Sequence, residues 1–306
     1  MIIINYLLIG FVLGMIFPIQ ATLGARINSG SENKLTGSMV AFVFGSVILF
    51  IINVVQQPTV FLNSATYQGI PLYYLIGGGI VGVIYNASVM NLFTRIGAFY
   101  TTIFTLVGQL IIGVVIDAFG LFSAPIRTIN LINIIGILMV LAAAVYINTA
   151  KKNDAQKLQL RYVIPTVILG MLPPLQQVFN RGLSEYVGSP LIATFMSFFI
   201  GALLLVVMIL AKTHRIDVPR LDGKGKRIPV YNYLAGAIGI AILMGNILIL
   251  PILGSTLSSI IALVGQIVMA MILDHFALLG MELKPMQIQK VAAVLTMVVG
   301  IVLLKL

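Results

Sequence analysis

The chain has 306 residues, of which 60% are hydrophobic and only 8% are charged, and it carries a net charge of +10 and no cysteine. A charged fraction this far below the roughly 25% of soluble domains indicates an integral membrane protein. The lack of cysteine excludes disulfides, thiolate metal sites and cysteine nucleophiles. The basic residues lie between apolar runs, where they are more typical of membrane orientation than of nucleic-acid binding.

Apolar runs of about 20 residues, the length that crosses the bilayer as a helix, follow one another along the chain. They predict an all-α integral membrane protein, because a barrel would show short alternating strands. The first run lacks a basic leader and a small-residue cleavage site, so we expect a retained span and not a signal peptide. The ten predicted transmembrane helices are residues 3–24, 36–55, 72–92, 98–119, 128–148, 162–181, 190–211, 231–250, 256–275 and 287–305.

A long motif occurs twice. LVGQLIIGVVIDAF, residues 106–119, returns 157 positions later as LVGQIVMAMILDHF, residues 263–276, with six identities. A second pair, GMIFPIQ and GMLPPLQ, begins at Gly14 and Gly170 and keeps this register to within one residue. The chain therefore reads as a duplication. We predict a first five-helix membrane repeat over residues 1–150, a connecting loop over 151–161 and a second five-helix repeat over 162–306.

Five spans per repeat make the halves inverted copies, because the sixth span enters the membrane from the face opposite to the first. The face that holds both termini then carries three of the 18 Lys and Arg residues, and the other face carries fifteen. The positive-inside rule places both termini outside, in a multi-pass protein of the cytoplasmic membrane. The most basic loop, 212–227, contains GKGK without the strand and glycine spacing of a phosphate loop, so we expect a solvated linker.

Candidate site residues lie in the helix that opens each half. Pro18 and Gln20 occur late in the first span, and Pro174, Gln176 and Asn180 occur in the sixth. Prolines at matching positions of inverted halves are helix-kink candidates, and such interrupted helices often flank a transporter's central site. Amides in lipid need partners, so these side chains should face the interior and are substrate-binding candidates. The alternative is a packing kink in which an amide joins two helices.

Gln109 and Gln266 lie in the middle of the fourth and ninth spans and are copies of each other. We expect them to line the substrate path, although bonding to a neighbouring helix is the other possibility. Tyr85 in the third span adds a polar group that the second half does not match, which would make such a path asymmetric.

Asp117 and Asp274 end the fourth and ninth spans. An acid at a helix C-terminus opposes the helix dipole, so its presence in both halves calls for an explanation. One hypothesis is a proton or cation coupling group, and the other is an interfacial acid paired with a base such as Arg127 or Lys284. Inversion puts the two acids on opposite membrane faces, which excludes a catalytic dyad.

These tandem five-helix halves resemble two domains of the YdcZ family within the drug/metabolite transporter (DMT) superfamily, over nearly the whole chain. The motif residues that carry the resemblance are Gly97, Gly108, Gln109 and Asp117 with their copies Gly254, Gly265, Gln266 and Asp274. The resemblance implies a secondary transporter, specifically an efflux protein, in the fused form of a family that often has single five-helix domains. The related small multidrug resistance branch exchanges protons on a glutamate in its first helix, and neither the first nor the sixth span here has an acid.

The leading hypothesis is a secondary transporter that exports a small organic molecule or metabolite across the cytoplasmic membrane by alternating access. The expected partners are this substrate and the lipid bilayer, with no nucleic acid and no cofactor, and a homodimer stays open. The main alternative is a non-transporting membrane scaffold or lipid-binding membrane protein. An enzyme is disfavoured, because the chain lacks a nucleophile motif, a metal cluster and an acid pair.

Overall fold

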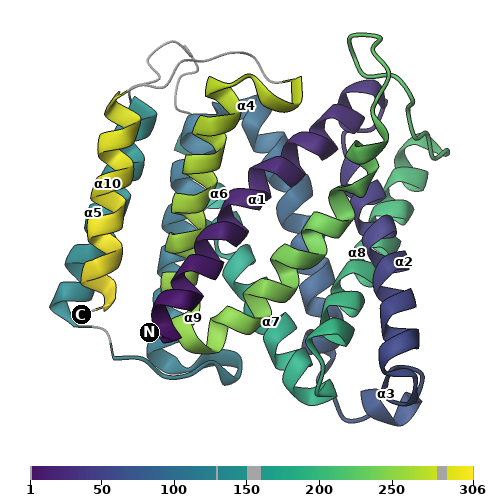
Figure 1. The fold of residues 1–306 in the computed structure, drawn as a ribbon, viewed down its shortest axis with the longest axis horizontal. Helices are drawn as coiled ribbons and strands as arrows, with labels where there is room; N and C mark the ends of the chain where they lie inside the picture. The colour runs from purple at the N-terminus through teal and green to yellow at the C-terminus, as the bar shows by residue number, and fades with distance from the viewer. Residues whose placement is uncertain (1, 129, 150–159, 281–287, 306) are drawn as a thin grey trace. The chain divides into compact units, whose positions relative to one another are not determined.

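The computed structural model describes residues 2–128, 130–149, 160–280 and 288–305. Within them the chain is almost entirely helical, and the one pairing of extended segments is the bridge between Leu221 and Arg227. Short 3-10 turns, η1 to η5, cover Ser64–Tyr67, Leu121–Ser123, Leu160–Tyr162, Val230–Leu234 and Leu278–Gly280. The α-helices (Figure 1) are α1 (Ile2–Gly30), α2 (Thr36–Gln56), α3 (Pro58–Phe61), α4 (Leu72–Phe119), α5 (Leu131–Thr149), α6 (Val163–Gly170), α7 (Leu172–Val187), α8 (Pro190–Thr213), α9 (Ala235–His275) and α10 (Ile288–Lys305).

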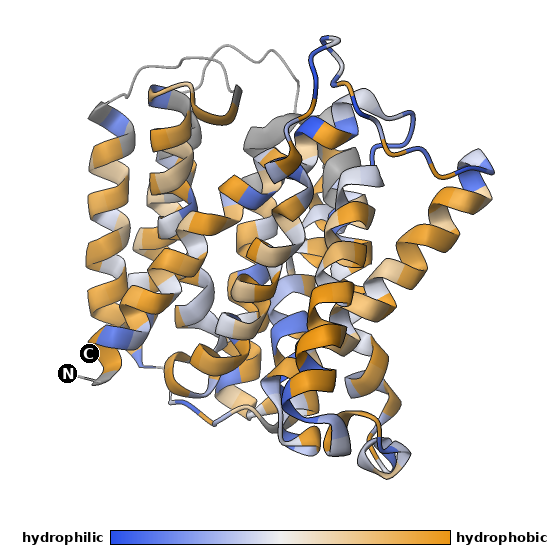
Figure 2. Ribbon diagram, turned by 45° about the vertical axis from the view of Figure 1, so that its right-hand side comes forward, coloured by the Kyte–Doolittle hydropathy of each residue, from blue (hydrophilic) through white to orange (hydrophobic). Residues whose placement is uncertain are grey.

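The surfaces of the helices fit a membrane protein. In the described residues four helical segments, Ile3–Gly30, Thr36–Gln56, Pro190–Thr213 and Val230–Leu273, are long and apolar enough to cross a bilayer, and shorter apolar helices accompany them. On α2 the exposed apolar residues recur along one face, at Val43, Val47, Phe50 and Val55. Figure 2 shows apolar residues covering the helices and hydrophilic residues mainly in the connections. These exposed apolar faces suit lipid.

The helix α4 contains two predicted spans, 72–92 and 98–119. In a straight α-helix, Tyr85 and Thr105 would lie about 30 Å apart, at 1.5 Å per residue. Instead the side chains of Tyr85 and Thr105 are hydrogen bonded to each other. The chain must therefore turn back between these residues, so α4 has two helical arms.

The helix α9 also joins two predicted spans, 231–250 and 256–275. It contains Pro251, and at Gly254 the backbone leaves the helical region, with φ 78° and ψ 173°. Only glycine adopts such a conformation readily, and proline removes a helical donor. The helix α9 is therefore two half-helices around a break at residues 251–254.

The predicted sixth span, 162–181, is split into α6 and α7 around Met171. Pro173 and Pro174 fall in the first turn of α7, where a missing N–H leaves no helical carbonyl without a partner. In the first half α1 continues through Pro18, and the hydroxyl of Thr22 donates to the carbonyl of Pro18 at 2.8 Å. The two copies thus use their prolines differently, at a helix start in one half and in a helix interior in the other.

The bounds of α8 follow from its sequence. The side chain of Ser189 accepts a hydrogen bond from the N–H of Ile192 at 3.4 Å, and Pro190 takes the first helical position. At the other end His214 is left-handed, with φ 55°, and its N–H donates to the carbonyl of Leu210 at 2.9 Å. The basic loop therefore leaves α8 at a defined residue.

By their internal contacts the residues form two compact units, and each unit contains segments of both halves of the sequence. Unit 1 comprises Met1–Met15, Tyr85–Leu175 and Ile249–Leu306, and unit 2 comprises Ile16–Ile84 and Gln176–Leu248. Three of the four crossings between the units fall within two residues of Pro18, Pro174 and Pro251.

In unit 1 the helices α5 and α10 lie side by side (Figure 1). A Cβ on Gly136 would lie 2.7 Å from the carbonyl oxygen of Gly300, and a Cβ on Gly300 would lie 2.8 Å from that of Gly136. The amide of Asn133 donates to the carbonyl of Leu304 at 3.3 Å. Glycine on both helices is thus what allows their backbones to approach.

In unit 2 the helices α2 and α8 pack along their length (Figure 1). Together with Val83 of α4 they form a buried core cluster of Met39, Val83, Leu205 and Ile209. At the end of α2 the buried amide of Asn53 donates to the carbonyl of Leu49 at 2.7 Å, within the same helix. An apolar core with a satisfied amide at its edge holds this helix pair.

Candidate functional site

Two repeat-related glutamines face glycines of other helices within unit 2. A Cβ on Gly239 of α9 would lie 2.5 Å from Nε2 of Gln20, and one on Gly82 of α4 would lie 2.5 Å from Nε2 of Gln176. The two glycines are 157 positions apart and the two glutamines 156. The same contact is therefore made twice, with the two halves exchanged. Both amides are half-buried, and no hydrogen bond to either is seen in the described residues.

One turn beyond Gln176, α7 carries the buried amide of Asn180. Its Oδ1 lies against Gly78 of α4, where glycine leaves room for it. Its Nδ2 is buried without a hydrogen-bond partner, and so is Oε1 of Gln177. Unpaired buried amide atoms are costly in a low-dielectric interior, and a bound molecule with complementary groups would satisfy them.

An aromatic pair in unit 2 shows the same exchange of contacts between the two halves of the sequence. The rings of Phe42 in α2 and Phe198 in α8 lie with centroids 5.1 Å apart. Phe198 occupies the space beside Gly45, and Phe42 occupies the space beside Gly201. These residues are also related by the duplication offset. A two-fold exchange of contacts at both the glutamines and the phenylalanines indicates that the two halves pair symmetrically in this unit.

In unit 1 the glycine that precedes each predicted glutamine makes a close helix contact. The Cβ position of Gly108 meets a carbonyl of α6, and that of Gly265 meets a carbonyl of α1, so substitution at either would push two backbones apart. Gln109 and Gln266 are the next residues and are half-buried. No hydrogen bond to either glutamine is seen in the described residues.

The predicted site residues thus fall into two groups. Gln20, Gln176, Asn180 and Pro18 belong to unit 2. Tyr85, Gln109, Gln266, Pro174 and Asp117 lie in unit 1, as does the backbone of Asp274, whose side chain is outside the described part. The side chain of Tyr85 already has a partner, Thr105, so this residue is less open to a ligand than the glutamines.

The carboxylate of Asp117, which is 4% exposed, caps the second half of α9. Its Oδ1 accepts a hydrogen bond from the backbone N–H of Ser255 at 2.7 Å, and its Oδ2 accepts one from Thr256 at 2.8 Å. These N–H groups follow the break at Gly254 and so lack partners within the helix. The acid that opposes the dipole of its own helix therefore meets the positive end of another helix.

Arg127 binds the backbone carbonyl groups on the other side of the same break in α9. Its Nη2 donates to the carbonyl of Pro251 at 3.2 Å and to that of Ile252 at 2.6 Å. Its backbone N–H donates to the backbone carbonyl of Asp117 at 2.7 Å. In the described residues the side chains of Asp117 and Arg127 form no ion pair with each other, so the acid and the base are linked through the broken helix.

A cavity of about 160 Å³ adjoins this break. Its polar lining comes from Asp117, Arg127, Thr128, Asn133 and Thr256, and apolar residues of several helices complete it. Nε of Arg127 and the hydroxyl of Thr256 are buried without a partner. The cavity is polar and large enough for ordered water, which would satisfy these groups.

From the sequence we expected Arg127 only as a possible partner for an acid, and its contacts with α9 were not predicted. The available signal was Pro251 followed by Gly254 inside an apolar run, since such residues mark a helix break whose carbonyls need donors. In the described residues no group of three or more His, Asp or Glu could hold a metal ion.

The comparison with known proteins agrees with the duplication. A family model described as "Putative inner membrane exporter, YdcZ" matches the chain twice, over residues 5–146 and 161–303. A search of curated proteins found no match. A solved structure described only as "Crystal structure of protein" is similar over 98% of this chain and 94% of its own, with a TM-score of 0.66 and 14% identity. At that identity the likeness concerns the fold alone.

Proposed function

The chain belongs to the YdcZ family of the drug/metabolite transporter superfamily, and from this membership we propose that it is a secondary transporter that exports a small organic molecule by alternating access. The family model is described as "Putative inner membrane exporter, YdcZ", and this description supports a membrane transporter over an enzyme. The substrate and the mechanism are our proposal.

The observation that carries the proposal is the exchanged glutamine contact. Gln20 lies against Gly239 and Gln176 lies against Gly82, so each half supplies one amide to a helix of the other half. Alternating access between repeat-related halves uses a site at the repeat interface that both halves build. Matched amides with free hydrogen-bonding capacity suit that site better than they suit packing alone.

The substrate class follows from the charges. In the described parts of the helices, the carboxylate of Asp117 is engaged by two N–H groups and the guanidinium of Arg127 by two carbonyls. The open groups are amides, which recognise a molecule through hydrogen bonds. We therefore propose a neutral or zwitterionic metabolite or drug-like molecule as the substrate.

The hinges are proposed at the prolines. The chain crosses between its two compact units close to Pro18, Pro174 and Pro251. Inside a helix, as at Pro18 and Pro251, proline removes one helical hydrogen bond and weakens the helix at that point. Pro174 instead lies at the start of α7, and residues at element ends absorb domain motions. In this proposal, bending at these residues lets the units move and opens the site to each face in turn.

The proposed topology keeps ten spans as two inverted five-helix repeats, over residues 1–150 and 162–306, with both termini outside. The broken α9, the turned α4 and the pair α6 and α7 support this number of spans. Ile3 and Leu304 line one cavity of unit 1, which supports placing both termini on one face of the membrane. Ten spans in one chain suffice for a monomeric transporter, and a homodimer is an outcome that the purified protein would show directly.

The test starts with the full chain in detergent and a panel of cationic, anionic, zwitterionic and neutral compounds, scored by thermal shift. A compound that stabilises the protein is then loaded into proteoliposomes, and its flux is measured. We expect the double variant Gln20→Ala, Gln176→Ala to fold with near wild-type stability and to lose at least about tenfold of the flux, since it removes ligand contacts worth more than ~1.4 kcal/mol.

The matched control is Gln68→Ala, because Gln68 is an exposed glutamine outside the spans. It should transport like the wild type. Normal flux in the folded double variant would remove both glutamines from the site. Binding of no panel compound and no flux from a well-folded sample would instead favour a membrane scaffold or lipid-binding protein.

A further inference from the structure

The basic loop after α8, expected to be a solvated linker, contains an ordered hairpin. The N–H of Asp222 donates to the carbonyl of Lys226 at 2.8 Å, and the N–H of Ile228 donates to that of Arg220 at 2.8 Å. The carboxylate of Asp222 accepts the N–H groups of Lys224 and Lys226 at 3.0 and 2.9 Å. Residues 219–228, here called the basic hairpin, therefore have a fixed turn.

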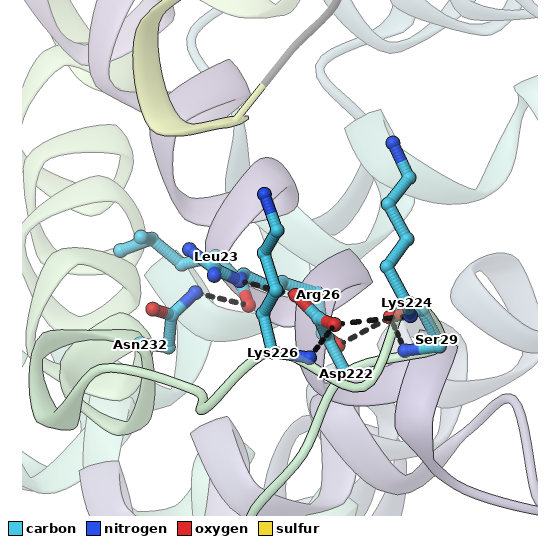
Figure 3. A network of polar contacts seen from close by, with 8 residues as sticks. Leu23, Arg26, Ser29, Asp222, Lys224, Lys226 and Asn232 are labelled. Atoms are coloured by element: carbon cyan, nitrogen blue, oxygen red, sulfur yellow. Dashed lines mark hydrogen bonds and ion pairs between the residues drawn. The ribbon is translucent and has the colours of Figure 1, made fainter.

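The basic hairpin is docked onto the C-terminal end of α1 within unit 2 (Figure 3). Oδ2 of Asp222 accepts a hydrogen bond from Nε of Arg26 at 3.2 Å, in an ion pair. The N–H of Gly223 donates to the hydroxyl of Ser29 at 3.0 Å. Gly30 lies directly against the carbonyl of Leu221, where a side chain would not fit. One face of the hairpin is thus used to hold α1.

The hairpin also carries positive charges that are not used in the contact with α1. Figure 3 shows the side chains of Lys224 and Lys226 extending away from the hydrogen-bonded atoms of the dock. These two lysines, Arg220 and Arg227 are exposed and have no acidic partner in the described residues. Residues 26–34 and 212–227 together hold eight Lys and Arg against three Asp and Glu. Such an excess attracts a polyanionic surface.

The same loop also carries exposed apolar side chains close in sequence to these basic residues. Ile216, Val218 and Leu221 are 46%, 43% and 54% exposed. The combination of basic heads and exposed aliphatic chains is typical of segments that lie at the boundary of headgroups and acyl chains. A nucleic acid or an acidic peptide would use the charges alone.

The position of the hairpin along the chain also indicates that it lies at the membrane surface. It begins six residues after α8 ends at Thr213, and it is docked on the last turn of α1, which ends at Gly30. Both helices are long enough to cross the membrane, so their ends lie at the headgroup level. We propose that the basic hairpin is a binding site for anionic phospholipid headgroups, with the aliphatic side chains inserted among the acyl chains.

The contact between the basic hairpin and α1 means that lipid binding at the hairpin also affects α1. Because Asp222 and Gly223 bind Arg26 and Ser29, a lipid that holds the hairpin also holds the end of α1. The helix α1 carries Gln20 two turns earlier. Anionic lipid therefore stabilises one position of the helix to which the transport site is assigned, although the lipid site itself does not depend on the transport proposal.

The test uses the full chain in neutral detergent, with binding measured by thermal-shift titration of short-chain phosphatidylglycerol, short-chain phosphatidylcholine and free glycerol phosphate. We expect phosphatidylglycerol to stabilise the protein and the other two to have little effect, because the site needs both a negative headgroup and acyl chains. The triple variant Lys224→Gln, Lys226→Gln, Arg227→Gln should weaken phosphatidylglycerol binding at least about tenfold, given about a fivefold effect per basic residue near an anionic surface.

The matched control is Lys224→Arg, Lys226→Arg, which keeps both charges and should bind within about twofold of the wild type. Should the triple variant fold poorly, salt supplies a second measurement on the wild type, since raising it from about 50 mM to about 500 mM screens exposed charges and should weaken phosphatidylglycerol binding. Equal responses to both lipids, binding by glycerol phosphate alone, wild-type affinity in the triple variant, or binding that salt does not change would each overturn the proposal.

Discussion

Oδ2 of Asp117 accepts a hydrogen bond of 2.8 Å from the backbone N–H of Thr256, which lies 139 residues further along the chain. With the matching bond from Ser255, this contact makes the last turn of one span the cap of a half-helix in the other half of the sequence. A helix broken in a low-dielectric interior needs partners for its freed backbone groups. Asp117 supplies the acceptors and Arg127 the donors, which explains how α9 tolerates Pro251 and Gly254.

The first prediction concerns this cap. Asp117→Ala should lower the free energy of unfolding by about 1–3 kcal/mol, because two buried N–H groups lose their acceptors. Asp117→Asn should cost less, since one acceptor oxygen stays. The measurement is the thermal or denaturant midpoint of the purified chain in one detergent. Asp217→Asn is the control, because Asp217 is exposed in the loop after α8.

The same variants separate the cap from a coupling role. If Asp117 acts only as a cap, loss of transport in Asp117→Asn should follow loss of stability. A variant as stable as the wild type that has lost transport would instead identify a coupling acid. The destabilisations caused by Arg127→Gln and Asp117→Ala should not add, because both side chains bond backbone groups that are freed at the same break in α9. Once one side chain is lost, loss of the other should cost less.

The second prediction concerns Gly24 of α1 and Gly37 of α2, which face each other. A Cβ on Gly37 would collide with the carbonyl oxygen of Gly24 and lie 3.0 Å from Oδ1 of Asn28, whereas a Cβ on Gly24 meets nothing nearer than 3.9 Å. Gly37→Ala should therefore destabilise the protein by on the order of 1–3 kcal/mol. Gly24→Ala should be neutral or stabilise it by up to about 1 kcal/mol. Equal destabilisation by both substitutions, measured by thermal unfolding, would contradict this reading of the contact.

The third prediction is a pH dependence of the basic hairpin. The backbone N–H of Lys226, followed by that of Lys224 and the guanidinium of Arg26, holds the pKa of the Asp222 carboxyl below its ordinary value. Asp222 therefore stabilises the fold fully above its unfolded pKa of about 3.9, and this contribution is lost as the pH falls through the lower folded pKa. The unfolding midpoint of the wild type should exceed that of Asp222→Asn at pH 7, and the difference should shrink in strong acid. A difference that stays constant from neutral to acid pH would show that the charge of Asp222 has no part in it.

Much of the architecture was readable from the sequence. Apolar runs of bilayer length require helices, because every backbone group in lipid must find its partner within the segment. The repeated LVGQ motif identified the duplication, and its glycines, Gly108 and Gly265, do make close helix contacts in the structure. The family match over both halves confirms that reading. Such features are local or periodic, so composition and residue spacing are enough to predict them.

The arrangement of the candidate site was less accessible. The sequence singled out Gln20 and Gln176, but it gave no sign that each would lie against a glycine of another helix, Gly239 and Gly82. The basic loop read as a solvated linker, yet one carboxylate, that of Asp222, folds it into a hairpin and docks it on α1. In each case the partner is distant in sequence and has no motif of its own.

The sequence by itself thus determined that this is a duplicated, helical membrane protein with matched amides and acids in its two halves. Only the tertiary structure decided what those groups touch. The charge of Asp117 and its place at a helix end are visible in the sequence, but its partners are backbone N–H groups that every residue possesses. Which of them are free depends on where another helix breaks and how closely the chain approaches it, and that is set by packing in three dimensions.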